Sequence, residues 1–241
     1  MTAQIQDARG SGTVTVSPAR DAEVFVRRSG GGWARVSSPV TIDEDYEIKA
    51  IGSPQQIAGS IEYKDYYGKY AGATYLQTGA YIRLKEAPRA IEEPGMPINM
   101  ETARIAIELF KGALFADIIP KQITKFECNT SVSVIGVKGT KFYVGHDEAE
   151  NVDTIKVYEG IAEVKSNSGR ADVSANEMVS VTSAGHSAPA PFDPSQDKTP
   201  WGQECCASAY LLGFAALGSF ALGNPQGMSN KGCKERNKYA D

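Results

Sequence analysis

Residues 136–144, Gly-Val-Lys-Gly-Thr-Lys-Phe-Tyr-Val, constrain the fold of this chain more than any other stretch. Gly136 and Gly139 are placed where a tight bend or a close backbone neighbour leaves no room for a side chain. Thr140 and Phe142 then begin a pattern in which every second residue is suited to burial. That period of two is the period of a β-strand with one buried face. The stretch therefore predicts a turn that leads directly into a half-buried strand.

The same alternation returns further along the chain. Residues 155–158 and 162–165 each alternate apolar with charged or aromatic positions, and Gly160 separates them. The whole chain of 241 residues contains 24 glycines and 12 prolines, which punctuate short alternating runs. Such punctuation is typical of many strands joined by turns. We therefore expect a mainly β fold, and none of these patterns is a catalytic device.

At this point the sequence resembles the FecR domain family. The turn and strand at 136–144 are followed by a Val-Tyr-Glu-Gly hairpin at 157–164 and by a closing strand at 174–181, in the family's order and spacing. Looser similarity extends to an opening hairpin at 24–33, a turn at 77–84 and a hairpin at 109–114. The resemblance covers residues 12–184, and its last third is the most specific part.

The resemblance implies a fold, a role and a set of signature residues. FecR-like domains are extracytoplasmic β modules of elongated build, so the expectation is a β-solenoid or β-sandwich-like domain. Their role is to give or receive contacts with other proteins, which implies a non-enzymatic interaction or structural module of the envelope or cell surface. The structural turn signature carried over to this chain consists of Gly136, Gly139, Thr140, Phe142 and Gly160.

Residues 101–119 allow two interpretations. Many of them are good helix formers, and Thr102 is suited to cap a helix. However, Ile105, Ile107 and Leu109 alternate at period two, and a Lys-Gly pair follows where a hairpin would turn. We expect two strands here, with a helix as the alternative.

The chain divides into four parts on composition. We expect a polar amino-terminal arm at 1–11 without the apolar core of a secretory signal, the FecR-like domain at 12–184, a proline-rich linker at 185–204, and a cysteine-flanked apolar segment at 205–241. Within the last part, residues 207–223 are uncharged and apolar, although short for a spanning helix. The segment is open to three interpretations, namely docking on a β domain, membrane contact by a helical C-terminal tail, or joining of subunits. The candidate assembly residues are Leu211, Phe214, Leu217 and Phe220.

The four cysteines match no zinc-binding pattern, because an adjacent pair cannot form the usual chelate loop. Cys128 lies in the strand before the signature turn. Cys205 and Cys206 precede the apolar segment and Cys233 follows it. A disulfide between Cys205 or Cys206 and Cys233 would join the two ends of that segment, and four reduced thiols are the alternative.

Charge and chemistry exclude several classes of function. The formal net charge is -4, and basic and acidic residues are interspersed, so the sequence has no extended basic patch of the kind that binds nucleic acid. Only two histidines exist, and His146 is expected in a solvated acidic loop, so we predict no catalytic residue. A calcium ion in that loop is the less favoured alternative, since the ordered spacing of a calcium loop is missing. We therefore expect no metal, no cofactor and no enzymatic activity.

Three hypotheses for function remain compatible with the sequence. The first is a protein-binding module of the envelope or cell surface, a homo-oligomer or surface assembly that uses strand edges and the C-terminal segment. The second is a carbohydrate-binding β-solenoid that uses its many tyrosines together with the acids Glu62, Asp65 and Asp147. The third is a sensory regulator of the anti-sigma type. A cytoplasmic location stays open beside the extracytoplasmic one.

Overall fold

The computed structural model describes residues 12–65, 68–88, 104–120, 123, 125–197 and 199. The chain forms two units, Met1–Asp193 and Pro194–Asp241. Strands dominate the first unit, so the expected mainly β fold is confirmed. The described part of the second unit contains one short 3-10 turn, η1 (Pro194–Gln196). Among the residues that the structure describes, no helix is long and apolar enough to span a membrane.

The described strands of the first unit are arranged in two layers, which we name the β1 layer and the β2 layer. In spatial order the β1 layer contains β4 (Val40–Ile42), β1 (Thr13–Pro18), β6 (Ile57–Lys64), β7 (Tyr70–Gln77), the second half of β9 (Arg104–Ile118), β12 (Lys141–Asp147), β13 (Val152–Glu159) and β16 (Glu177–Thr182), with β17 (Gly185–His186) and β18 (Ala190–Pro191) beside β16. The β2 layer contains β3 (Ala34–Val36), β2 (Glu23–Arg28), β5 (Tyr46–Ile51), β8 (Tyr81–Glu86), the first half of β9, β10 (Lys125–Asn129), β11 (Val134–Val137), β14 (Ile161–Ser166) and β15 (Gly169–Ser174).

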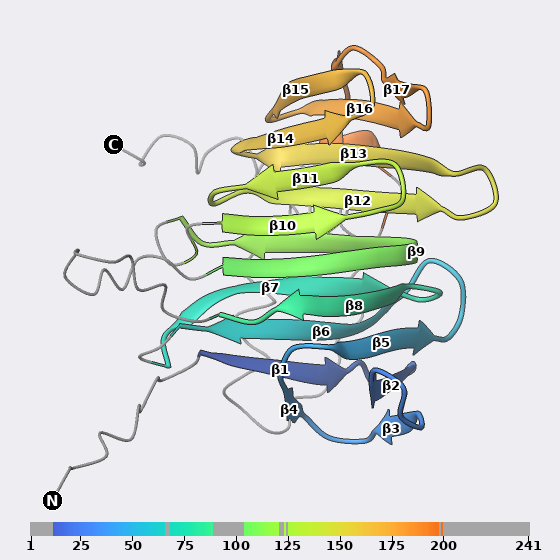
Figure 1. Cartoon of the computed structure of the whole chain (residues 1–241), viewed down its shortest axis with the longest axis vertical. Coiled ribbons are helices and arrows are strands. Elements are labelled where there is room, and N and C mark those ends of the chain that lie inside the picture. The colour runs from blue at the N-terminus through green and yellow to red at the C-terminus, as the bar shows by residue number, and fades with distance from the viewer. Residues whose placement is uncertain are drawn as a thin grey trace, which may run out of the picture. The chain divides into compact units, whose positions relative to one another are not determined.

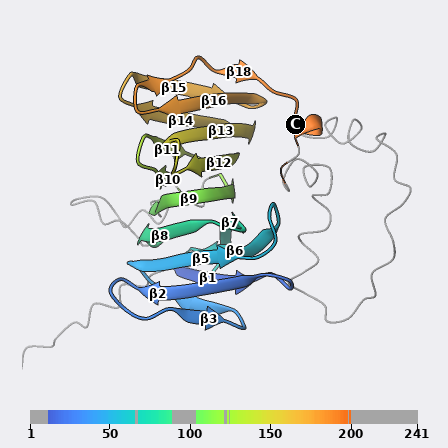
Figure 2. The same cartoon turned by 90° about the vertical axis from the view of Figure 1, so that its right-hand side faces the viewer.

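Hairpins alternate between the two layers along the chain. The hairpin β10–β11 belongs to the β2 layer, β12–β13 to the β1 layer, and β14–β15 again to the β2 layer. The last strand of one hairpin pairs with the first strand of the next hairpin in its own layer, as in β11 with β14 and β13 with β16. Figures 1 and 2 show the resulting stack, which runs from β3 and β4 to β15 and β17. The described pairings are antiparallel except for β9 with β10, which is parallel.

Strand β9 joins the two layers because it lies in both. Its 15 residues pair with β8 and β10 in the first half and with β7 and β12 in the second half. Gly112 is the corner between the halves, with φ +84°. A Cβ atom there would lie 2.7 Å from the Ala80 Cα atom and 2.8 Å from the Gly79 carbonyl oxygen. The predicted strand character is therefore correct, but Lys111 and Gly112 form a corner inside one strand instead of a hairpin turn.

The core lies between the layers and is built from the inward-facing half of each alternating strand. Its largest members include Tyr63 from β6, Phe126 from β10 and Phe142 from β12. Phe126 contacts both of the others in edge-to-face geometry, with ring centroids 6.1 and 5.8 Å apart. Since β6 and β12 belong to one layer and β10 to the other, these aromatic contacts hold the two layers together.

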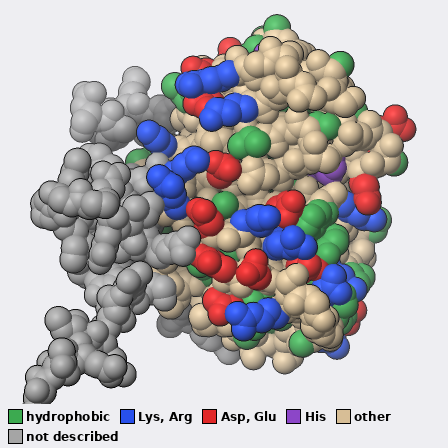
Figure 3. Space-filling model, in the orientation of Figure 1, with side chains coloured by type: hydrophobic (Ala, Val, Ile, Leu, Met, Phe, Trp, Pro, Cys, Tyr) green, Lys and Arg blue, Asp and Glu red, His purple; other side chains and the backbone are tan. Residues whose placement is uncertain are grey.

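The outer face of the β2 layer carries charges that alternate in register across four strands. Arg27, Glu47, Arg83 and Glu108 are successive cross-strand partners. The Glu47 carboxylate lies 2.6 Å from an Arg27 nitrogen and 2.9 Å from an Arg83 nitrogen. Figure 3 shows basic and acidic side chains intermingled over the face seen in Figure 1.

Glu47 is nearly buried, and the hydroxyl of Tyr81 donates a hydrogen bond to it at 2.6 Å. Burial acts to raise the pKa of this carboxyl group. The hydrogen bonds from Tyr81, Arg27 and Arg83 together act more strongly in the other direction, so the pKa falls from 4.5 to about 2. The row of charges therefore depends on an ionised Glu47.

The two ends of the stack differ in their edge strands. At one end the edge strands β3 and β4 have three residues each. At the other end β17 and β18 pair with β16, inside the segment predicted to be a linker. Strand β15, with six residues, is the longest edge strand, and among the described strands it pairs only with β14. Within the described residues, one side of its backbone is therefore open to a further strand.

Candidate functional site

A buried histidine and aspartate form the centre of the most polar part of the core. His146 in β12 and Asp153 in β13 are cross-strand partners, and the His146 Nδ1 atom lies 2.7 Å from the Asp153 Oδ1 atom. Their side chains are 2% and 0% exposed. The prediction of a solvated loop at His146 is therefore wrong. The strand continues to Asp147, so His146 takes the same inward face as Phe142.

The second carboxylate oxygen of Asp153 accepts hydrogen bonds from the loop between β10 and β11. Asp153 Oδ2 accepts a hydrogen bond from the Thr130 hydroxyl at 2.6 Å and another from the Ser133 hydroxyl. Thr130 Oγ1 in turn accepts the backbone N–H groups of Val132 and Ser133 at 3.1 and 2.9 Å. A buried carboxylate needs several such donors to offset the loss of its hydration. Here they tie the loop to the β12–β13 hairpin.

Ser131 completes an arrangement that has the order of a catalytic triad. Its Oγ atom lies 3.3 Å from His146 Nε2, on the far side of the ring from Asp153. However, the Ser131 hydroxyl donates its hydrogen to Asn151 Oδ1 at 2.5 Å. A hydroxyl has a single hydrogen, and a nucleophilic serine must direct it to the base. The observed geometry therefore favours a tether between two loops over an activated nucleophile.

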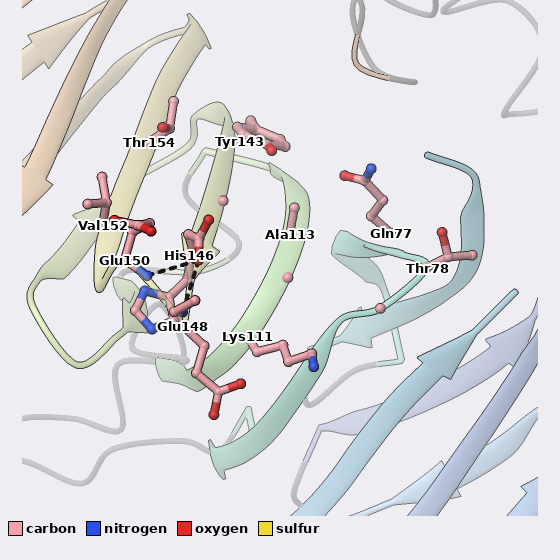
Figure 4. Close-up of a pocket in the computed structure, with 15 residues that line it drawn as sticks. Gln77, Thr78, Lys111, Ala113, Tyr143, His146, Glu148, Glu150, Val152 and Thr154 are labelled. Carbon is pink, nitrogen blue, oxygen red and sulfur yellow. Dashed lines mark hydrogen bonds between the residues drawn. The ribbon is translucent and has the colours of Figure 1, made fainter. Parts of the chain in front are cut away.

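Next to His146 lies an open hollow with a volume of about 790 Å³. It is formed by the β7–β8 turn, the β9 corner and the β12–β13 hairpin (Figure 4). Lys111 lines one side, and the acidic hairpin residues Asp147, Glu148 and Glu150 line the other. Asp147 Oδ1 accepts two backbone N–H groups of its own hairpin, those of Ala149 and Glu150, at 2.9 and 3.2 Å. The hollow is thus open and bordered by charged side chains, and the Asp147 carboxylate stabilises the turn beside it.

The acids proposed for a carbohydrate site are not brought together. Asp147 lines the hollow, whereas Glu62 lies in β6 and Asp65 in the loop that follows β6. Asp65 Oδ1 accepts the backbone N–H of Lys69 at 2.9 Å, which stabilises that loop. Within the described ranges, no group of three His, Cys, Asp or Glu residues is placed to hold a metal ion.

The tyrosines of the same hypothesis do not share one surface. Tyr63 is buried, and its hydroxyl donates to Thr74 Oγ1 at 2.9 Å. Tyr75 lies on the outer face of the β1 layer, 6.2 Å from the ring of Phe115. Tyr81 lies on the outer face of the β2 layer, where it packs 6.0 Å from the ring of Trp33. A single carbohydrate platform built from these tyrosines is therefore not supported.

The five signature residues lie within a strand, at the turns between strands, or in the core. Gly136 lies within β11, where a Cβ atom would meet no atom within 4 Å, so the predicted crowding is not present there. Gly139 has φ +72°, and a Cβ atom there would lie 2.5 Å from Pro120. The Thr140 hydroxyl is buried and donates to the Ile161 carbonyl at 3.0 Å. Phe142 belongs to the core, and Gly160 joins β13 to β14.

Cys128 is a free thiol in the core. Burial is the main reason that its pKa is raised, and the nearby carboxylate of Asp153 adds to the effect. The other three cysteines and the candidate assembly residues lie outside the described residues. Their predicted disulfide and assembly roles stay predictions.

No known family model matches this chain, and no curated protein matches it. Among solved structures, the chain is similar to two crystal structures, each of a proposed anti-sigma factor from Parabacteroides distasonis. The first match has 17% identity and a TM-score of 0.41, and covers 52% of this chain and 53% of the other. The second has 15% identity and a TM-score of 0.41, and covers 60% and 61%. The chain thus spans between half and two thirds of the length of each neighbour, and membership of the FecR family stays a prediction.

Proposed function

We propose that the first unit is a non-enzymatic protein-binding module of the cell envelope or cell surface, which binds extended segments of protein partners at an open sheet edge. The observation that carries the proposal is β15, a six-residue edge strand with one described neighbour. An extended segment that adds a strand there gains backbone hydrogen bonds, while alternate side chains provide specificity. The envelope location rests on the resemblance to FecR domains.

The backbone of β15 is suited to this role. A two-residue turn joins β14 to β15, so Ser166 and Gly169 form the first hydrogen-bonded pair of the ladder. Since hydrogen-bonded pairs alternate along an antiparallel ladder, Ala171 and Val173 also bond to β14. Arg170 and Asp172 must then direct their N–H and C=O groups away from β14. The Ser174 N–H supports this assignment, because it is directed at Glu177 Oε2 at 2.8 Å.

The non-enzymatic part of the proposal is supported by the hydrogen bonds of the buried cluster. The Ser131 hydroxyl hydrogen is directed to Asn151, and Asp153 accepts three hydrogen-bond donors. A fluorophosphonate probe, which labels activated serines, is expected to leave Ser131 unmodified. Stoichiometric labelling of Ser131, detected by peptide mass, would overturn this part.

The binding role is tested with a display library of extended peptides selected against the immobilised full chain. Asp172→Pro removes one open-edge N–H without removing a bond to β14, and Asp172→Ala keeps that N–H as the matched control. Selected peptides are expected to lose binding to Asp172→Pro and to retain it with Asp172→Ala. Peptides that bind both variants equally would refute the edge as the binding site.

The role of the C-terminal segment is tested separately. Light scattering compares the full chain with a chain truncated before Cys205. If the two forms are equally soluble and both monomeric, the segment has no part in assembly, whereas the edge proposal is unaffected.

A further inference from the structure

We infer that β15 pairs antiparallel with β15 of a second copy of this chain, in the register centred on Ala171. The inference deepens the proposed function, on which it rests, by naming the partner of the open edge. It depends on the directions of the β15 backbone groups, on the faces of its side chains and on the charges of Arg170 and Asp172.

The faces of the β15 side chains limit the registers that are available. Val173 is fully buried and faces the core, whereas the side chains of Arg170 and Asp172 are 60% and 62% exposed. A second copy that continues the layer must place inward residues opposite inward residues, because side chains alternate between faces. A two-fold axis must therefore pass through a residue and not between two residues.

Charge then selects one of the remaining registers. An axis at Ala171 places Arg170 opposite Asp172 of the second copy, and the same pair recurs by symmetry. An axis at Arg170 or at Asp172 places that residue opposite its own copy. Like charges that are directly opposite destabilise a sheet, whereas opposite charges stabilise it. Only the register centred on Ala171 pairs both charges favourably.

The backbone agrees with this register. Arg170 and Asp172 direct their N–H and C=O groups to the open side, so each Arg170–Asp172 pair between copies would be a hydrogen-bonded pair. On the inner face Ala171 would lie opposite its own copy, and Val173 would lie opposite Gly169. The side chains in these pairs are small, so they fit between the two layers if the core extends into the second copy. The hydrogen bonds that join the β14–β15 hairpin to the segment after β16 come from the turn between the two strands, since Asn167 Nδ2 donates to the Ser183 carbonyl and the His186 N–H donates to Ser168 Oγ.

An unfavourable contact inside one copy supports the same pairing. Asp172 is the cross-strand partner of Glu163, so two carboxylates are directly opposite each other. Arg170 lies 2.8 Å from Glu163 but is 3.6 Å from Asp172. Lys165 also lies 2.9 Å from Glu163, so Asp172 is the acid of the pair with the weaker ion pairing. Arg170 of a second copy, placed opposite Asp172 on its other side, would give Asp172 a closer cation.

The test is a charge exchange measured by sedimentation velocity of the full chain under reducing conditions, over a range of concentrations. Arg170→Asp and Asp172→Arg each place like charges opposite each other, and each is expected to weaken dimerisation at least about tenfold. An equimolar mixture of the two variants restores both opposite-charge pairs and is expected to dimerise. The double variant Arg170→Asp with Asp172→Arg restores them within one chain and is also expected to dimerise.

Arg35→Asp is the matched control, since Arg35 is an exposed, ion-paired residue on the edge strand β3 at the other end of the stack. It is expected to leave dimerisation unchanged. A monomeric parent chain at all concentrations, or single variants that the mixture and the double variant do not rescue, would overturn the inference. If the parent is monomeric and the selected peptides still require the Asp172 N–H, the self-pairing fails while the proposed function stands.

Discussion

The corner of β9 provides the sharpest test of the architecture. We predict that Gly112→Ala destabilises the fold much more than Gly79→Ala does. Both glycines have a left-handed backbone, with φ +84° at Gly112 and +90° at Gly79. Each substitution therefore carries a similar conformational cost of about 1–2 kcal/mol, offset in part by about 0.4–1 kcal/mol from the stiffer unfolded chain.

The two sites differ in the space around the added carbon. A Cβ atom at Gly79 would meet nothing within 4 Å, whereas one at Gly112 would lie 2.7–2.8 Å from backbone atoms of Gly79 and Ala80. Backbone atoms cannot rotate away as a flexible side chain can, so the layers must shift. Shifts of that kind cost about 1–3 kcal/mol. The expected free energy of unfolding is thus lower by about 1 kcal/mol for Gly79→Ala and by about 2–4 kcal/mol for Gly112→Ala.

The assay is urea denaturation of both variants and the parent, with thermal melts as a second measurement. For a domain of this size the additional loss at Gly112 corresponds to a Tm roughly 2–12 °C below that of Gly79→Ala. Equal losses in the two variants would mean that the β9 corner is not tightly packed against the β7–β8 turn. In that case the reasoning from the close approach of the two backbones is refuted.

Three further predictions concern the polar groups and the core thiol. Asp153→Asn is expected to lower the free energy of unfolding by about 3 kcal/mol, because three donors lose their charged acceptor. Asp43→Asn, at an exposed carboxylate away from β15, should change it by less than about 0.5 kcal/mol, and equal effects in denaturant titrations would contradict the buried cluster. The pKa of Glu47 is lower in the fold, about 2, than its ordinary 4.5. Its contribution to stability is therefore present above pH about 4.5 and is lost as the pH falls toward 2, and Glu47→Gln should flatten the stability profile in that window. Cys128 should resist alkylation by iodoacetamide in the folded chain and react after unfolding, which peptide mass analysis measures; rapid modification of the native chain would contradict its burial and raised pKa.

Much of the fold could be predicted from local patterns. The alternation at Phe142 and at Ile155 predicted the buried faces of β12 and β13, because the period of a strand is set by its own backbone. The corner at Gly112 could not be distinguished from a hairpin in this way. Both place alternating residues on either side of a Lys-Gly pair, and only the neighbours β7, β8, β10 and β12 decide between them.

The buried cluster has a signal in the sequence, although the prediction of a solvated loop missed it. The inward series that contains Phe142 and Val144 extends two positions further to His146, and the series of Ile155 and Val157 extends back to Asp153. Following each alternation to its end would have placed both polar residues in the core. The contribution of Thr130 and Ser131 could not be found in this way, because it depends on a loop of the other layer.

The open side of β15 likewise follows from the arrangement of whole strands and not from its own six residues. A strand of the same composition in the middle of the layer would have two neighbours. What the local sequence does contain is the Arg-x-Asp spacing at Arg170 and Asp172, which acquires a meaning only at an edge.

The shared strand β9 also bears on how this unit opens. Because its two halves are hydrogen-bonded inside different layers, β9 fixes the two layers to each other at the corner. Amide protons on both sides of the corner should therefore exchange with solvent only through global unfolding, and with nearly the same protection. The outermost hairpins, which have no such bridge, should exchange earlier, so the unit should loosen from its ends toward its middle.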